Sequence, residues 1–192
     1  MLADALQATD QDLVLLFAQG DSAAFEEVVR RHEQRIYNLS LRMLGRPEDA
    51  RDATQETFLA ALRKLPSFRG DSSLGTWLHR VAVNACYDIL RRRKRRAEEG
   101  LPEDPGAAPG DLAESSAEAV DVQRALAQVP EEFRAVLVLH DVQDLPYDEI
   151  AEILGVPVGT VKSRVHRGRV GLARLLPGTD GSPGASDGKM EA

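Results

Sequence analysis

The chain has 192 residues, of which 43% are hydrophobic and 5% aromatic, and 31 acidic against 24 basic side chains give it a net charge of −7. Its one cysteine, Cys86, excludes an internal disulfide and any metal site built from several cysteines. No apolar run approaches the ~18 residues of a membrane span, and no signal peptide opens the chain, so we expect a cytoplasmic protein without membrane insertion.

The charge is distributed in blocks along the chain. Residues 87–96 hold six basic side chains and one acid, and residues 162–176 hold five basic side chains and no acid. Residues 97–132, by contrast, hold ten acids and one base. Because salt confines each field to about 8–10 Å, the two basic patches can bind nucleic acid in spite of the negative total.

In the first half of the chain, apolar residues recur at helical period and no segment alternates at period two for the length of a strand. Gly45 is suited to end one helix and Pro47 to begin the next. The predicted helices run from Thr9 or Asp10 to near Gly20, from Asp21 or Ser22 to Gly45, from Pro47 to Leu65, and from about 74 to 96.

The second half begins with an acidic segment, 98–117, that is rich in Pro, Gly and Ala and lacks an apolar period, which predicts a flexible linker. Four shorter helices are predicted at about 118–128, 131–142, 147–154 and 157–176, and the tail 178–192 is predicted to be disordered. The expected fold is therefore all-α, with two small helical domains, 1–97 and 118–177, joined by the linker.

Residues 147–167 have the pattern of a helix-turn-helix. Ala151 is small where the helices cross, Gly155 lies in the turn, and Pro157 suits the first turn of the second helix. Val161 and Val165 form the apolar back of that helix, so its opposite, donor-rich face is predicted to contact duplex DNA. The predicted contacts are Thr160, Lys162, Ser163, Arg164, His166 and Arg167.

The predicted helix over 74–96 ends in a run of six basic side chains, more than the helix dipole alone would favour. The polar loop 68–76 before it could hold an unpaired base, whereas Trp77 is interpreted as a core residue. The residues predicted to bind nucleic acid here are Phe68, Arg69, Arg80, Asn84, Tyr87 and Arg91.

An acidic stripe follows the predicted helix over 47–65. Asp49, Asp52 and Glu56 are spaced by three and four residues, and like charges so placed cost a helix about 0.2–0.5 kcal/mol per pair. A partner protein would explain the stripe, and Gln55 and Phe58 lie close enough to share the contact. A plain solvated face is the alternative.

Together these segments resemble bacterial sigma factors of the extracytoplasmic-function (ECF) group in the sigma-70 family, from about residue 12 to residue 176. Residues 48–58 resemble the helix that binds core RNA polymerase, 67–84 the segment that melts and recognises the minus-ten element, and 148–164 the helix-turn-helix that reads the minus-thirty-five element. Pro146 and Pro157 depart from the pattern, because many relatives have a capping Ser at these positions.

The resemblance implies that the first domain binds the clamp helices of core polymerase and captures the unwound minus-ten strand. It implies that the second domain binds the polymerase flap and the minus-thirty-five duplex, and that the acidic linker threads the polymerase channels. An anti-sigma factor is an implied partner, and association with the nucleoid is implied for the polymerase-bound form.

Two other classes of protein share parts of this pattern. A dimeric helix-turn-helix regulator would explain residues 147–176, but it gives no role to the basic helix or the acidic stripe. An enzyme is disfavoured because the chain holds only partial motifs: Ile36 stands where a zinc protease starting at His32 needs its second His. We therefore expect no enzymatic activity, no cofactor and no bound metal.

Overall fold

The computed structural model describes residues 8–100 and 117–176, and in these ranges all regular structure is helical. The elements are α2 (Asp10–Ala18), α3 (Ser22–Leu44), α4 (Pro47–Lys64), η1 (Leu65–Ser67), α5 (Leu74–Glu98), α6 (Ala117–Gln128), α7 (Glu131–Leu137), η2 (Val138–Val142), α8 (Tyr147–Leu154) and α9 (Val158–Leu175). The predicted all-α class is confirmed. The predicted linker 98–117 falls almost wholly outside the described residues, as does the tail 178–192. None of the described helices is both long and apolar enough to cross a membrane.

Local capping sets the helix ends close to their predicted positions. Thr9 and Asp12 form a reciprocal capping box at the start of α2, and the Asp21 side chain accepts from the first turn of α3. Gly45 ends α3 in the left-handed conformation, with φ 76°, where a residue without Cβ is unstrained. Pro47 occupies the first turn of α4, as predicted.

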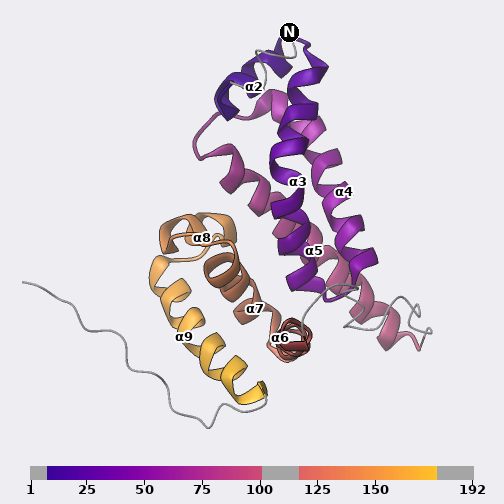
Figure 1. Cartoon of the computed structure of the whole chain (residues 1–192), viewed down its shortest axis with the longest axis vertical. Coiled ribbons are helices and arrows are strands. Elements are labelled where there is room, and N and C mark those ends of the chain that lie inside the picture. The colour runs from indigo at the N-terminus through magenta and orange to yellow at the C-terminus, as the bar shows by residue number, and fades with distance from the viewer. Residues whose placement is uncertain (1–7, 101–116, 177–192) are drawn as a thin grey trace, which may run out of the picture.

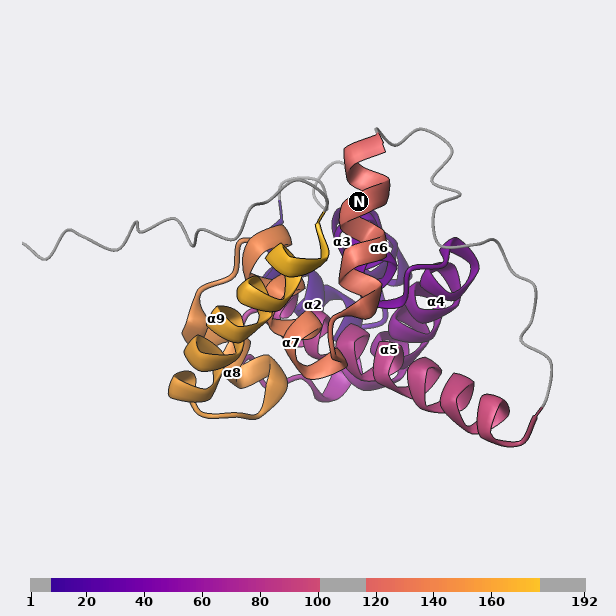
Figure 2. The same ribbon diagram turned by 90° about the horizontal axis from the view of Figure 1, so that it is seen from below.

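We call α2–α5 the N-terminal unit and α6–α9 the C-terminal unit; Figures 1 and 2 show them side by side. In the N-terminal unit, α3 packs against α2, α4 and α5. Its fully buried side chains include Leu13, Val28, Ile36, Leu39 and Leu78. In the C-terminal unit, α9 packs against α7 and α8.

The two units share one hydrophobic core. Side chains of α3 and α5 belong to the same buried cluster as Ala135, Val136, Leu139, Ile150 and Val161 of the C-terminal unit. In this arrangement α6, α7 and η2 lie against α3, and α8 lies against α5.

The carboxyl end of α3 is the meeting point of both units. An α-helix leaves its last carbonyls without partners within the helix. Here they accept hydrogen bonds from three other helices: the Arg42 carbonyl from Gln123 of α6 (3.3 Å), the Met43 carbonyl from Arg134 of α7 (2.6 Å) and the Leu44 carbonyl from Arg93 of α5 (3.0 Å). One helix end therefore helps to position α5, α6 and α7.

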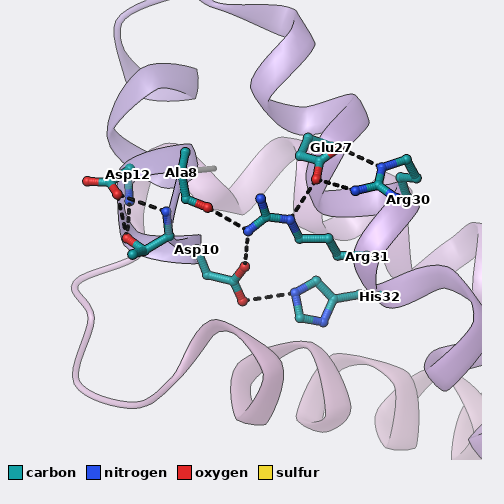
Figure 3. A network of polar contacts seen from close by, with 8 residues as sticks. Ala8, Asp10, Asp12, Glu27, Arg30, Arg31 and His32 are labelled. Atoms are coloured by element: carbon teal, nitrogen blue, oxygen red, sulfur yellow. Dashed lines mark hydrogen bonds and ion pairs between the residues drawn. The ribbon is translucent and has the colours of Figure 1, made fainter. Parts of the chain in front are cut away.

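A polar network ties α2 to α3 (Figure 3). Glu27, only 7% exposed, accepts hydrogen bonds from Arg30 (2.6 and 2.7 Å) and from Arg31 (2.7 Å). Arg31 also donates to the Ala8 carbonyl (2.8 Å) and to Asp10 (3.2 Å). Hydrogen bonds from the two guanidinium groups lower the pKa of Glu27 from 4.5 to about 2. The chain from Ala8 into α2 is therefore held by a guanidinium that Glu27 orients.

We predict that Glu27→Gln lowers the free energy of unfolding at neutral pH. A carboxylate whose pKa is depressed by folding adds stability above its unfolded pKa of 4.5, and that stability is lost as the pH falls towards about 2. The difference in free energy of unfolding between wild type and Glu27→Gln should therefore be smaller at about pH 3 than at about pH 7. Urea denaturation at the two pH values measures it. The control is Glu26→Gln, because Glu26 is an exposed neighbour on the same helix. If Glu27→Gln lowers the free energy of unfolding equally at both pH values, the Glu27 carboxylate does not stabilise the fold through these hydrogen bonds.

Candidate nucleic-acid interface

The predicted helix-turn-helix is formed by α8 and α9. The backbone N–H groups of Gly155, with φ 64°, and of Val156 both donate to the Ala151 carbonyl and close α8. Pro157 is the N-cap of α9, so the prediction that it lies in the first turn of this helix is wrong. Its carbonyl accepts a hydrogen bond from Thr160 N (2.8 Å). Pro146 caps α8 in the same way, and neither proline supplies a side-chain cap.

The back of α9 approaches α7 closely. Val161 and Val165 are buried, as predicted from the helical wheel. Gly168 is also buried, and a Cβ added there would lie 3.0, 3.1 and 3.2 Å from three carbons of Leu137. Glycine at this position therefore lets the two helices come together, which fixes how α9 projects from the unit.

The predicted DNA-contacting residues of α9 divide into two groups. Lys162, His166 and Arg167 are exposed and form the front of the helix, with the Lys162 ammonium 5.9 Å from the centre of the Tyr147 ring. Thr160 and Ser163 are half-buried, and the Ser163 hydroxyl donates to the Thr160 carbonyl (2.9 Å). The exposed group has the positive charge and the donors that phosphates and base edges accept.

Arg164, the remaining residue of the six predicted on α9, is turned towards the body of the unit. Its side chain is 25% exposed and forms an ion pair (3.0 Å) with Glu132, which lies in the first turn of α7. Arg169 forms a second ion pair with Asp141 (2.6 Å). Both pairs tie α9 to the preceding helices, and the sequence analysis did not identify either acid.

The predicted face of α5 is partly covered. Asn84 and Arg91 are exposed, whereas Arg80 and Tyr87 are half-buried, and Tyr87 lines a groove together with residues of α7. Burial raises the pKa of the Tyr87 hydroxyl. Arg91 forms an ion pair with Asp88 of the same helix.

In the loop before α5, Arg69 is exposed and Phe68 packs on Trp77, with ring centroids 5.4 Å apart. Trp77 is 9% exposed, in agreement with its interpretation as a core residue. The Thr76 hydroxyl, at the loop's end, donates to Glu149 of α8 (2.7 Å). The loop is thus supported from the core and contacted by the C-terminal unit.

The acidic stripe of α4 faces the basic end of α5. Asp49 forms an ion pair with Arg93, and Glu56 forms one with Arg92 (3.0 Å). Asp52 is exposed in the groove between α4 and α5 that these paired side chains line. Opposite charges within the chain therefore offset the repulsion along the stripe.

Gln55 and Phe58 lie on the other side of α4, in a groove of about 500 Å³ between α3 and α4. Leu59 and Leu62 line the same groove and are 49% and 42% exposed. Two large exposed apolar side chains at a spacing of three residues mark an apolar surface. The sequence analysis missed both, although leucines beside a polar stripe were the available signal.

The buried thiol of Cys86 has its pKa raised to about 12, chiefly by loss of contact with water, so it is not a reactive group. Within residues 8–100 and 117–176, no three His, Cys, Asp or Glu side chains are grouped so that they could hold a metal ion.

Comparisons with known proteins match both units. The family model for sigma-70 region 2 matches residues 28–96, and that for sigma-70 region 4 matches residues 119–172. The ECF RNA polymerase sigma factor SigM of Mycobacterium tuberculosis is 41% identical over 170 residues, which cover 88% of this chain and 86% of the relative. SigE of Mycolicibacterium smegmatis is 43% identical over 168 residues, which cover 83% of this chain but only 65% of that longer relative.

Two solved structures have a similar fold. The sigma factor RpoE in complex with the anti-sigma factor NepR, from Bartonella quintana, superposes with a TM-score of 0.68 at 26% identity, covering 79% of this chain and 95% of the other. CnrH in complex with the cytosolic domain of CnrY gives a TM-score of 0.66 at 30% identity, covering 86% and 96%.

The close approach at Gly168 yields a double-mutant prediction. We expect Gly168→Val to destabilise the C-terminal unit by about 1–3 kcal/mol, because the new side chain overlaps Leu137. Adding Leu137→Ala should make the double variant less destabilised than the sum of the single variants. Gly171→Val is the control, since a Cβ there has no neighbour within 4 Å. Equal costs at 168 and 171, measured by urea denaturation, would rule out the overlap.

Proposed function

Since this chain belongs to the ECF group of the sigma-70 family, we propose that it binds the core of bacterial RNA polymerase and directs transcription initiation at specific promoters. The observation that carries the proposal is the presence of three separate surfaces on one chain: the front of α9, the exposed part of α5 with its preceding loop, and the α3–α4 groove. A regulator that only binds duplex DNA would use the first of them.

The polymerase contact is assigned to α4 and the groove beside it. Gln55 and Phe58 line this groove, and the exposed apolar side chains of Leu59 and Leu62 give it a surface that a partner helix can bury. Asp52 lies on the neighbouring face of α4 and adds an exposed negative charge. Asp49 and Glu56 belong to this contact only if the polymerase competes with Arg93 and Arg92 for them.

The minus-ten contact is assigned to α5 and its loop. Asn84 has the donors and the acceptor to pair with a base edge, and Arg91 and Arg69 supply exposed positive charge for phosphates. Phe68, half-buried against Trp77, offers a ring on which an unstacked base can lie. Arg80 and Tyr87, both half-buried, complete this face of α5.

The minus-thirty-five contact is assigned to the front of α9. Lys162, His166 and Arg167 reach furthest into solvent, so they are the residues that we expect to meet base edges and phosphates in the major groove. Thr160 and Ser163 lie at the base of this surface. Arg164 acts mainly through its ion pair with Glu132, by holding α9 in place.

We further propose that the chain has an anti-sigma factor among its partners, because both structural neighbours were solved with a second protein, described for RpoE as an anti-sigma factor. It acts in the cytoplasm, at the nucleoid when bound to polymerase, and has no enzymatic activity of its own.

Binding to core polymerase separates this function from that of an ordinary helix-turn-helix regulator. Purified chain should co-elute with core polymerase in size-exclusion chromatography. Leu59→Glu should weaken the complex by at least about tenfold, since it places a charge in an apolar contact. Leu15→Glu is the matched control, because Leu15 is 61% exposed on α2 and does not line the groove.

Two results would count against the assignment. If the wild-type chain does not bind core, the duplex-binding regulator becomes the better account. If Leu59→Glu and Leu15→Glu bind core equally well, the α3–α4 groove is not the contact.

A further inference from the structure

The Tyr147 ring connects the π-helical turn η2 to the front of α9. Tyr147 is the first residue of α8 and is half-buried. Its ring lies beside the His140 imidazole of η2, with ring centroids 4.6 Å apart and ring planes inclined by 37°. The Lys162 ammonium of α9 lies over the same ring, 5.9 Å from its centre. One aromatic side chain therefore links three successive elements, the last of which carries the residues assigned to duplex DNA.

Hydrogen bonds to Leu145 hold the His140–Tyr147 pair in place. His140 Nδ1 lies 3.0 Å from the Leu145 carbonyl oxygen, and because a carbonyl can only accept, Nδ1 carries the proton and donates. The Leu145 N–H donates in turn to the Leu139 carbonyl of η2 (3.1 Å). Leu145 is thus bound to η2 through both of its backbone groups, two residues before Tyr147. The ring therefore projects from a fixed backbone.

A lysine that binds DNA gains from a contact of this kind. Its four-carbon stem is among the most flexible of side chains, and the freedom that it gives up on binding lowers the affinity. An ammonium within about 6 Å of the centre of a Tyr ring is attracted by the negative face of the ring. Lys162 remains exposed, so its N–H donors stay open to a ligand while the ring narrows the space that the ammonium explores.

Packing is the other role that the Tyr147 ring has, and Arg167 separates the two roles. The ring packs against the core cluster that includes Ile150 and Val161. Arg167 is exposed on the same helix as Lys162, but five residues further on and about 140° around the helix axis. If the ring serves only the packing of α8 and α9, its loss disturbs Lys162 and Arg167 alike. If it positions the lysine, its loss is felt through Lys162 alone.

We propose that Tyr147 is a positioning residue for promoter recognition: its ring, supported by His140, holds the Lys162 side chain so that the ammonium meets the major groove already ordered. The proposal rests on the proposed function, which assigns the front of α9 to duplex DNA. Tyr147 then raises the affinity for DNA through Lys162 without needing a DNA contact of its own, because part of the ordering is complete before binding.

The first measurement needs no DNA. The full-length chain has four lysines, so isotope-labelled lysine gives few side-chain signals in an NMR spectrum, and the signal that Lys162→Met removes is that of Lys162. Protons above an aromatic face are shifted upfield by the ring current. We expect the methylene signal next to the Lys162 ammonium to move downfield in Tyr147→Leu and to keep its upfield position in Tyr147→Phe, which retains the ring. Urea denaturation verifies that each variant is folded under the conditions used.

The second measurement is a double-mutant cycle on DNA affinity. The probe is a short duplex enriched from a random pool by core polymerase loaded with the full-length wild-type chain. Tyr147→Leu should weaken binding of this duplex by about two- to tenfold, the cost of ordering one long side chain, and Tyr147→Phe should bind as the wild type does. In the Lys162→Met background Tyr147→Leu should cause no further loss, whereas in the matched Arg167→Met background it should cause its full loss.

Three results would overturn the proposal. The first is a Lys162 signal that Tyr147→Leu leaves unmoved, and the second is a loss of affinity as large in Tyr147→Phe as in Tyr147→Leu, which would make the hydroxyl a direct contact. The third is an equal effect of Tyr147→Leu in the Lys162→Met and Arg167→Met backgrounds, which would leave packing alone. If the loaded polymerase enriches no duplex, the proposed function fails and this role fails with it. A duplex that is enriched and bound, but without coupling between Tyr147 and Lys162, defeats the positioning role alone.

Discussion

The carboxyl end of α3 is the constraint on which the rest of the arrangement depends. Its last carbonyls need partners from outside the helix, and α5, α6 and α7 each supply one donor to consecutive carbonyls at Arg42, Met43 and Leu44. Two of these donors are guanidinium groups, which the negative end of the helix dipole attracts. Hydrogen bonds to this one helix end therefore help to set both the direction of α5 and the position of the C-terminal unit.

Charge in this molecule is balanced between contacts within the chain and contacts with partners. Arg92 and Arg93 are paired with acids of α4, and Arg164 and Arg169 are paired within the C-terminal unit. The basic side chains that remain exposed, on the front of α9 and at the end of α5, are those that duplex or single-stranded DNA can neutralise. A chain with a net charge of −7 can thus present two positive surfaces.

The helices and their ends could be predicted because their signals are local. Thr9, Gly45 and Pro47 act on the backbone next to them, and the apolar periodicity marks which face each helix buries. The pairing of Asp49 with Arg93 could not be predicted in this way, because the two residues are 44 positions apart and meet only after α4 and α5 have packed. The coverage of Tyr87 was missed for the same reason, since it depends on how the two units dock. For the contacts on α9, the helical wheel placed Arg164 beside Lys162, and only the position of Glu132 shows that their roles differ.

The central claim is that this chain gives core polymerase its promoter specificity. The most direct test is run-off transcription with purified bacterial core polymerase on fragments of genomic DNA, with and without the chain. The account predicts discrete new transcripts that appear only when the chain is added, with start sites preceded at constant spacing by two shared sequence elements. The same transcripts without the chain, or none with it although the chain binds core and such promoters are present, would contradict the account.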